Sequence, residues 1–136
     1  MTTIRKEILI AAPAAKVWSH LANAGLIARW FLPNDFQPVV GRRFTLTCGH
    51  DGVIDCEVKE VTPLTRLVYT FRPAGVTSDT VVTFTLEETV SGTKLTLVHS
   101  GWDELKPGDA ALFDQYDQGW GSQFLPRLQN LFERRP

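Results

Sequence analysis

The sequence predicts an α+β fold in which a curved, antiparallel six-stranded sheet wraps around one long C-terminal helix. Two observations predict this arrangement. Between residues 43 and 100, short segments alternate apolar and polar side chains, which is typical of antiparallel strands with one face in water. After residue 108, the apolar residues change to helical spacing. The length of 136 residues suits a single domain, residues 1–136, built around one core.

The N-terminal part predicts one strand followed by two short helices. The first strand is expected from Ile4 to Ile10. Pro13 suits the first position of a helix in PAAKVWSHL, because its missing N–H has no helical partner to lose there. Val17 and Leu21 lie four residues apart and therefore share one face of that helix. Asn23 is expected to cap a second short helix in AGLIARWF.

Five further strands complete the predicted sheet. They are expected in RRFTLTC, VIDCEVKEV, RLVYTFR, TVVTFTLEE and GTKLTLVHS. In the last of these, His99 falls on the same inward face as Leu95 and Leu97. Adjacent strand residues point to opposite faces, so His99 is not expected to activate Ser100 as a hydrolase dyad.

The C-terminal stretch DAALFDQYDQGWGSQFLPRLQNLFERR predicts the long helix, with Asp109 near its N-terminus. Pro126 removes one backbone hydrogen bond, and Gly119 and Gly121 weaken the same region, so a kink is expected there. A single helix does not fill a curved sheet. A cavity is therefore expected between the two, closed at one end by the short helices.

Composition and motifs argue against several classes of function. The net charge of −1 offers no basic surface for nucleic acid. No signal peptide and no apolar run of about 20 residues is present, so a cytoplasmic protein without stable membrane anchoring is expected. The three histidines are scattered, and Cys48 and Cys56 fit reduced cysteines on one apolar face, so no metal site is expected. No phosphate-binding or dinucleotide motif is present, and no cofactor is expected.

Five stretches carry a resemblance to a known family: IAAPAAKVWSHLAN, LIARWFLPNDFQPVVGRRFTL, VKEVTPLTRLVYTF, GTKLTLVHSGW and GWGSQFLPRLQNLFE. They cover nearly the whole chain in order. The sequence resembles the START-like (helix-grip, Bet v 1-like) superfamily, in the branch named after the activator of Hsp90 ATPase. This resemblance implies an internal hydrophobic pocket for lipids, hormones, polyketides or other small apolar molecules. The superfamily also includes cyclases and hydratases, and it supplies no fixed set of catalytic residues.

The first functional hypothesis is a binder of a small hydrophobic or aromatic ligand that catalyses no reaction. Each aromatic side chain alone is expected to pack in the core, but together they suit an apolar pocket with a few polar groups. The candidate ligand-binding residues are Trp30, Phe31, Phe44, Tyr69, Phe71, Phe84, Leu97, His99, Trp102, Phe113, Tyr116, Asp117, Trp120 and Phe124.

A second hypothesis is an enzyme of the cyclase, hydratase or isomerase kind. On an ideal helix, Asp117 lies roughly 40° to one side of Phe113, and Tyr116 roughly 60° to the other. Together with His99, either residue could carry out general acid–base chemistry on a bound molecule. The alternatives are that Asp117 sits at the pocket mouth, met by water or an arginine, and that His99 only makes a backbone hydrogen bond.

The third hypothesis is a protein-binding module. The family name implies an Hsp90-type chaperone as a partner. The exposed strand edges of an open sheet also permit a homodimer, although nothing in the sequence requires one.

Overall fold

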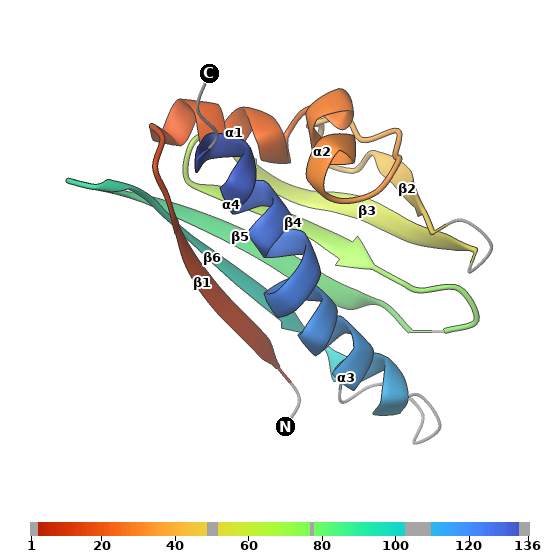
Figure 1. Cartoon of the computed structure of the whole chain (residues 1–136). Coiled ribbons are helices and arrows are strands. Elements are labelled where there is room, and N and C mark those ends of the chain that lie inside the picture. Colours follow the sequence, from red (N-terminus) through yellow and green to blue (C-terminus); the bar gives the residue numbers. More distant parts are fainter. Residues whose placement is uncertain (1–2, 49–51, 77, 103–109, 134–136) are drawn as a thin grey trace.

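A computed structural model describes residues 3–48, 52–76, 78–102 and 110–133, and it confirms the predicted fold class (Figure 1). Asp109, expected near the start of the long helix, lies outside the described residues. The elements in order are β1 (Ile4–Ile10), α1 (Ala14–Leu21), α2 (Ala24–Trp30), β2 (Arg43–Thr47), β3 (Val53–Thr62), β4 (Arg66–Phe71), β5 (Thr80–Thr89), β6 (Gly92–Ser100), α3 (Ala110–Gly119), η4 (Trp120–Phe124) and α4 (Leu125–Glu133).

The six strands form one antiparallel sheet in the order β1-β6-β5-β4-β3-β2. Strands β2 to β6 are therefore neighbours in sequence order, and β1 pairs with β6 at the far edge. The segment α3–η4–α4 runs across one face of this curved sheet, and α1 and α2 lie together at one end (Figure 1). Along β6, buried and half-buried side chains alternate, as the period-two pattern predicts.

The two short helices begin close to the predicted positions. The Asn23 side chain accepts a hydrogen bond from the backbone N–H of Leu26 at 3.1 Å, so the predicted cap of α2 is confirmed. Pro13 was expected at the first helical position. Instead it lies one residue earlier, with an extended backbone (ψ 155°), and α1 starts at Ala14. The Ala14 N–H then bonds to a Glu88 carboxylate oxygen at 3.1 Å, which satisfies one of the open donors of this helix end.

The long helix contains a π-helical turn, η4, where the sequence predicts a kinked α-helix. The Leu125 N–H donates to the Trp120 carbonyl, five residues back instead of four. Pro126 follows directly, and a proline ring clashes with the carbonyl four residues before it. A wider turn just ahead of Pro126 relieves that crowding.

The π turn also changes which side chains face the sheet. On an unbroken α-helix, Leu125 would lie roughly 120° from Phe113 and outside the apolar stripe. The extra residue in the turn brings it back by roughly 100°. Leu125 and Leu128 are accordingly buried together with Trp120, whereas Phe124 is only half-buried.

Aromatic side chains fill the centre of the interface between sheet and helix. Trp30, Phe71, Phe84 and Trp120 are almost completely buried. Phe31 joins them, with ring centroids 5.0 Å from Trp120 and 6.5 Å from Phe71. The middle of the expected cavity is therefore occupied by the protein's own rings.

Candidate functional site

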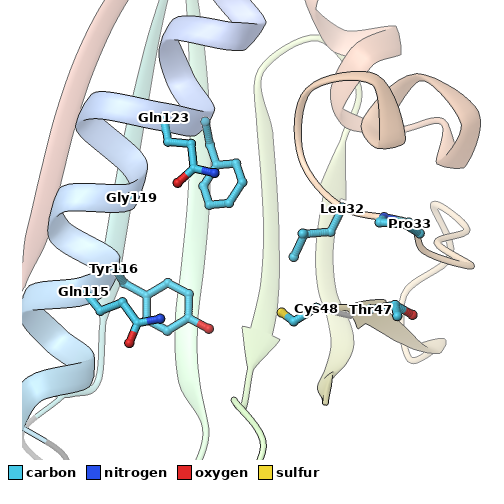
Figure 2. A pocket seen from close by; sticks show the side chains of 9 residues that line it. Leu32, Pro33, Thr47, Cys48, Gln115, Tyr116, Gly119 and Gln123 are labelled. Atoms are coloured by element: carbon cyan, nitrogen blue, oxygen red, sulfur yellow. The ribbon is translucent and has the colours of Figure 1, made fainter. Parts of the chain in front are cut away.

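A pocket of about 410 Å³ lies at the side of this aromatic core, between the C-terminal helical segment and strand β2 (Figure 2). We call it the β2 pocket. Its lining residues are Leu32, Pro33, Thr47, Cys48, Gln115, Tyr116, Gly119, Gln123 and Phe124. Figure 2 shows the side chains of the helical segment on one side and those of β2 and the stretch after α2 opposite them. The volume falls within the range of sites for small organic molecules.

The lining combines apolar surface with uncharged polar groups. Leu32, Pro33 and Phe124 supply aliphatic and aromatic contacts, and the Tyr116 ring reaches in from α3 (Figure 2). The side-chain amides of Gln115 and Gln123 offer both donors and acceptors. None of the lining side chains carries a formal charge, so the pocket is built for a neutral molecule.

The helical side of the pocket has a simple local origin. Gln115, Gly119 and Gln123 follow one another at intervals of four residues and lie on the same flank of the helix. Gly119 stands between the two amides and leaves space that a side chain would occupy. Sequence reasoning missed this row, although polar–small–polar residues at helical spacing beside an apolar stripe were a usable signal.

A second, smaller pocket of about 250 Å³ adjoins the first. The two share Cys48, Gln115 and Tyr116. The smaller pocket extends along β3 to Gly52 and to Pro73, just beyond β4. An elongated ligand could therefore occupy both.

The candidate ligand-binding residues divide into two groups. Tyr116 and Phe124 line the β2 pocket. The larger group is buried in the core without lining it, namely Trp30, Phe31, Phe44, Tyr69, Phe71, Phe84, Leu97, His99, Trp102 and Trp120. Phe113 is half-buried, and its ring centroid lies 5.7 Å from that of Trp102. Ligand contact by these side chains stays a prediction.

His99 sits at the centre of a buried hydrogen-bonded chain. Its Nδ1 accepts from the Trp120 indole N–H at 3.1 Å. The Thr80 hydroxyl donates to the Phe71 carbonyl, so its oxygen accepts from His99 Nε2–H at 2.7 Å. Trp102 adds a bond from its indole N–H to the His99 carbonyl oxygen at 3.1 Å. Every nitrogen of the neutral imidazole is therefore satisfied, and the proton is assigned to Nε2.

This environment keeps His99 uncharged. Burial among aromatic rings lowers the pKa of His99 to about 3, because the surrounding side chains cannot solvate an imidazolium. A base needs an available lone pair, and the Nδ1 lone pair is already engaged by Trp120. In this conformation His99 connects β6 to the helix and has no ring atom open to a ligand.

Asp117 lies on the β1 side of the helix. Its carboxylate is 3.0 Å from Lys6 Nζ, and its side chain is 43 % exposed. Salt-bridge pairing at the helix margin explains how a carboxylate is accommodated beside an apolar stripe. The expected cation was Arg29 or Arg42, and the structure supplies Lys6 instead. Tyr116 is closer to His99, with ring centroids 5.9 Å apart.

The two cysteines differ in environment, and neither forms a disulfide. Cys56 is buried on β3, where burial, followed by the charge of Asp55, raises the pKa of its thiol. Cys48 is only half-buried and lines the β2 pocket. Within the described ranges, no group of His, Cys, Asp or Glu side chains is placed to hold a metal ion. In the same residues, no helix combines the length and apolarity that crossing a membrane requires.

Comparison with known proteins places this geometry among relatives. Residues 11–133 match the family described as "Activator of Hsp90 ATPase homolog 1-like protein". Protein MLL2253 from Mesorhizobium loti is 36 % identical, with a TM-score of 0.88 and 98 % of each chain covered. DynU16, described from the dynemicin biosynthetic locus, is 25 % identical with a TM-score of 0.84; 98 % of this chain covers 48 % of that one.

A third similar structure is the Aha1 dimer from Colwellia psychrerythraea. It is 22 % identical with a TM-score of 0.81, and 98 % of this chain covers 97 % of that chain. At this identity the likeness concerns the fold alone. A search of curated protein sequences finds no significant match.

Proposed function

This chain belongs to the family of activator of Hsp90 ATPase homolog 1-like proteins, and on that premise we propose that it binds a small, neutral, apolar molecule in the β2 pocket. The observation that carries the proposal is the pocket itself. It joins apolar walls to uncharged amide, hydroxyl and thiol groups, a combination that favours a ring system with a few hydrogen-bonding substituents. Similarity to DynU16, from a biosynthetic locus, supports a small-molecule role.

The proposed role is binding without catalysis. Both ring nitrogens of His99 are engaged, and the Asp117 carboxylate is held by Lys6. Neither group is placed to exchange a proton with a molecule in the β2 pocket, which leaves the cyclase or hydratase alternative without a proton-transfer pair. The pocket offers positioning and a dry environment.

A fluorescence titration with N-phenyl-1-naphthylamine, an uncharged aromatic probe, tests the proposal. The probe should gain fluorescence and bind one site per chain. Gly119→Leu fills the pocket and should abolish binding. Gln118→Leu, on the neighbouring exposed position outside the lining, is the matched control and should bind as the wild type does. Equal binding by both variants would place the probe elsewhere and contradict the proposal.

The family match also favours a second candidate, contact with an Hsp90-type chaperone, either by one chain or by a homodimer. A pull-down with purified Hsp90, together with sedimentation of this chain alone, tests both parts. Absence of complex at micromolar concentrations would remove the chaperone candidate. This result would leave the β2 pocket proposal unaffected, since the probe titration is independent of it.

A further inference from the structure

A separate cleft of about 490 Å³ lies where α1 meets the last turn of α4. We call it the α1–α4 cleft. It is bordered by the turn at residues 11–13, and the lining side chains that matter here are Lys16, Ser19, His20, Arg29, Leu131 and Phe132. It shares no lining residue with the β2 pocket. Two clefts of similar size and opposite chemistry therefore flank the helical segment.

Positive charge distinguishes the α1–α4 cleft. Lys16 on α1 and Arg29 on α2 both line it, and neither forms an ion pair with any residue that the structure describes. No carboxylate is among the lining side chains. The sequence contains no Asp or Glu between Glu7 and Asp35, so both short helices lack acidic residues altogether. In a chain of net charge −1, this is a local excess of cations.

The wall of the cleft is held in place by local contacts. The hydroxyl of Ser19 and the Nδ1–H of His20 both donate to the Lys16 carbonyl oxygen, at 2.8 and 2.9 Å. Phe132 meets the His20 ring edge-on, with centroids 4.7 Å apart. Together with Leu131, the Phe132 ring provides an apolar surface next to the two cations. An aromatic ring beside fixed positive charge suits a molecule that is apolar at one end and anionic at the other.

We propose that the α1–α4 cleft binds a small organic anion. Its carboxylate or phosphate group lies between Lys16 and Arg29, and its apolar part packs on Phe132 and Leu131. A guanidinium matches the two oxygens of such a group with parallel hydrogen bonds, and an ammonium adds a point charge. The site takes the charged class of ligand that the uncharged β2 pocket disfavours.

An NMR titration of the ¹⁵N-labelled chain with 1-naphthyl phosphate tests the inference, with 1-naphthol as the uncharged matched probe. The phosphate should shift backbone amides at Lys16, Ser19, His20 and Phe132, and raising the salt concentration should weaken it. Naphthol should shift mainly residues of the β2 pocket. If the phosphate shifts the β2 pocket residues instead, the α1–α4 cleft is not its site and the inference is wrong.

Charge-matched variants separate a built site from general electrostatics. Arg29→Gln and Lys16→Gln should each weaken the phosphate roughly tenfold, the range expected for losing one charged hydrogen bond. Arg42→Gln removes the same charge from another exposed arginine without an ion pair among the described residues, and should leave affinity unchanged. All three side chains are exposed, so the folded spectrum should persist. Equal weakening by all three, or by none, would overturn the proposal.

Discussion

The buried neutral His99 predicts a specific loss of stability in acid. The pKa of His99 is about 3 in the folded chain, against an ordinary value of 6.5. Because the folded pKa is depressed, the unfolded chain binds the proton more readily than the folded one. Stability from this residue is therefore complete above pH 6.5 and falls as the pH drops toward 3. The rings of Trp102, Trp120, Tyr116 and Phe71 surround the imidazole, so desolvation sets this direction.

The size of the effect follows from proton linkage. Between pH 8 and pH 5 the free energy of unfolding should fall by about 2 kcal/mol on account of His99 alone. That figure is robust, because pH 5 lies well above the folded pKa and the loss then depends almost entirely on the unfolded chain. Continued acidification to pH 3 would bring the total to roughly 5 kcal/mol, a large part of a typical domain's stability.

Urea denaturation of wild type and His99→Gln at pH 8 and pH 5 isolates this term. Glutamine cannot titrate, so the wild type should lose about 2 kcal/mol more than the variant over the same interval. Other titrating groups cancel in the difference. As a second measurement, the His99 ring resonances of the folded wild type should not move between these pH values. Equal losses in both proteins, or a titrating His99 resonance, would refute the burial argument.

Three further predictions follow from the same geometry. Thr80→Val leaves the Nε2–H of the histidine without an acceptor and should lower the free energy of unfolding by about 1–3 kcal/mol, measured by urea titration. Gly119→Ala should raise it by up to about 1 kcal/mol, because its added Cβ meets nothing closer than 3.6 Å; Gly121→Ala, whose Cβ comes within 3.3 Å of a lysine side chain, should gain less. N-ethylmaleimide should modify Cys48 in the folded chain and reach Cys56 only after denaturation, as mass spectrometry would show; a saturating pocket ligand should slow the first reaction.

The arrangement of strands and helices was predictable, because each strand alternates cleanly and the helix changes the period. His99 illustrates the limit of this reasoning. Its inward face was predicted from the alternation of β6, but its partner was not, since Trp120 lies 21 residues away and meets it only through the path of the helix. A sequence pattern tells which face is buried and carries no information about which groups meet there.

The pocket was harder to predict for two physical reasons. Its polar lining, such as Gln115 and Gln123, has the composition of an ordinary solvent-exposed helix face, so no burial signal marks it. The π turn is also invisible in a continuous helical pattern, and angles extrapolated from Phe113 are therefore wrong beyond Trp120. Aromatic residues drew attention because of their size, and most of them pack against one another.

The π turn at Trp120–Phe124 has a consequence for how this chain can change over evolutionary time. It is equivalent to a one-residue insertion that the helix has absorbed locally. The pocket-facing half before it and the sheet-anchoring half after it are thus offset from the usual helical phase. Each half can accept substitutions that suit its own task without forcing a compensating rotation of the other. Loss of one residue here would restore a uniform helix and reorient Leu125 and Leu128 away from the sheet, so length in this short stretch is under tighter constraint than residue identity.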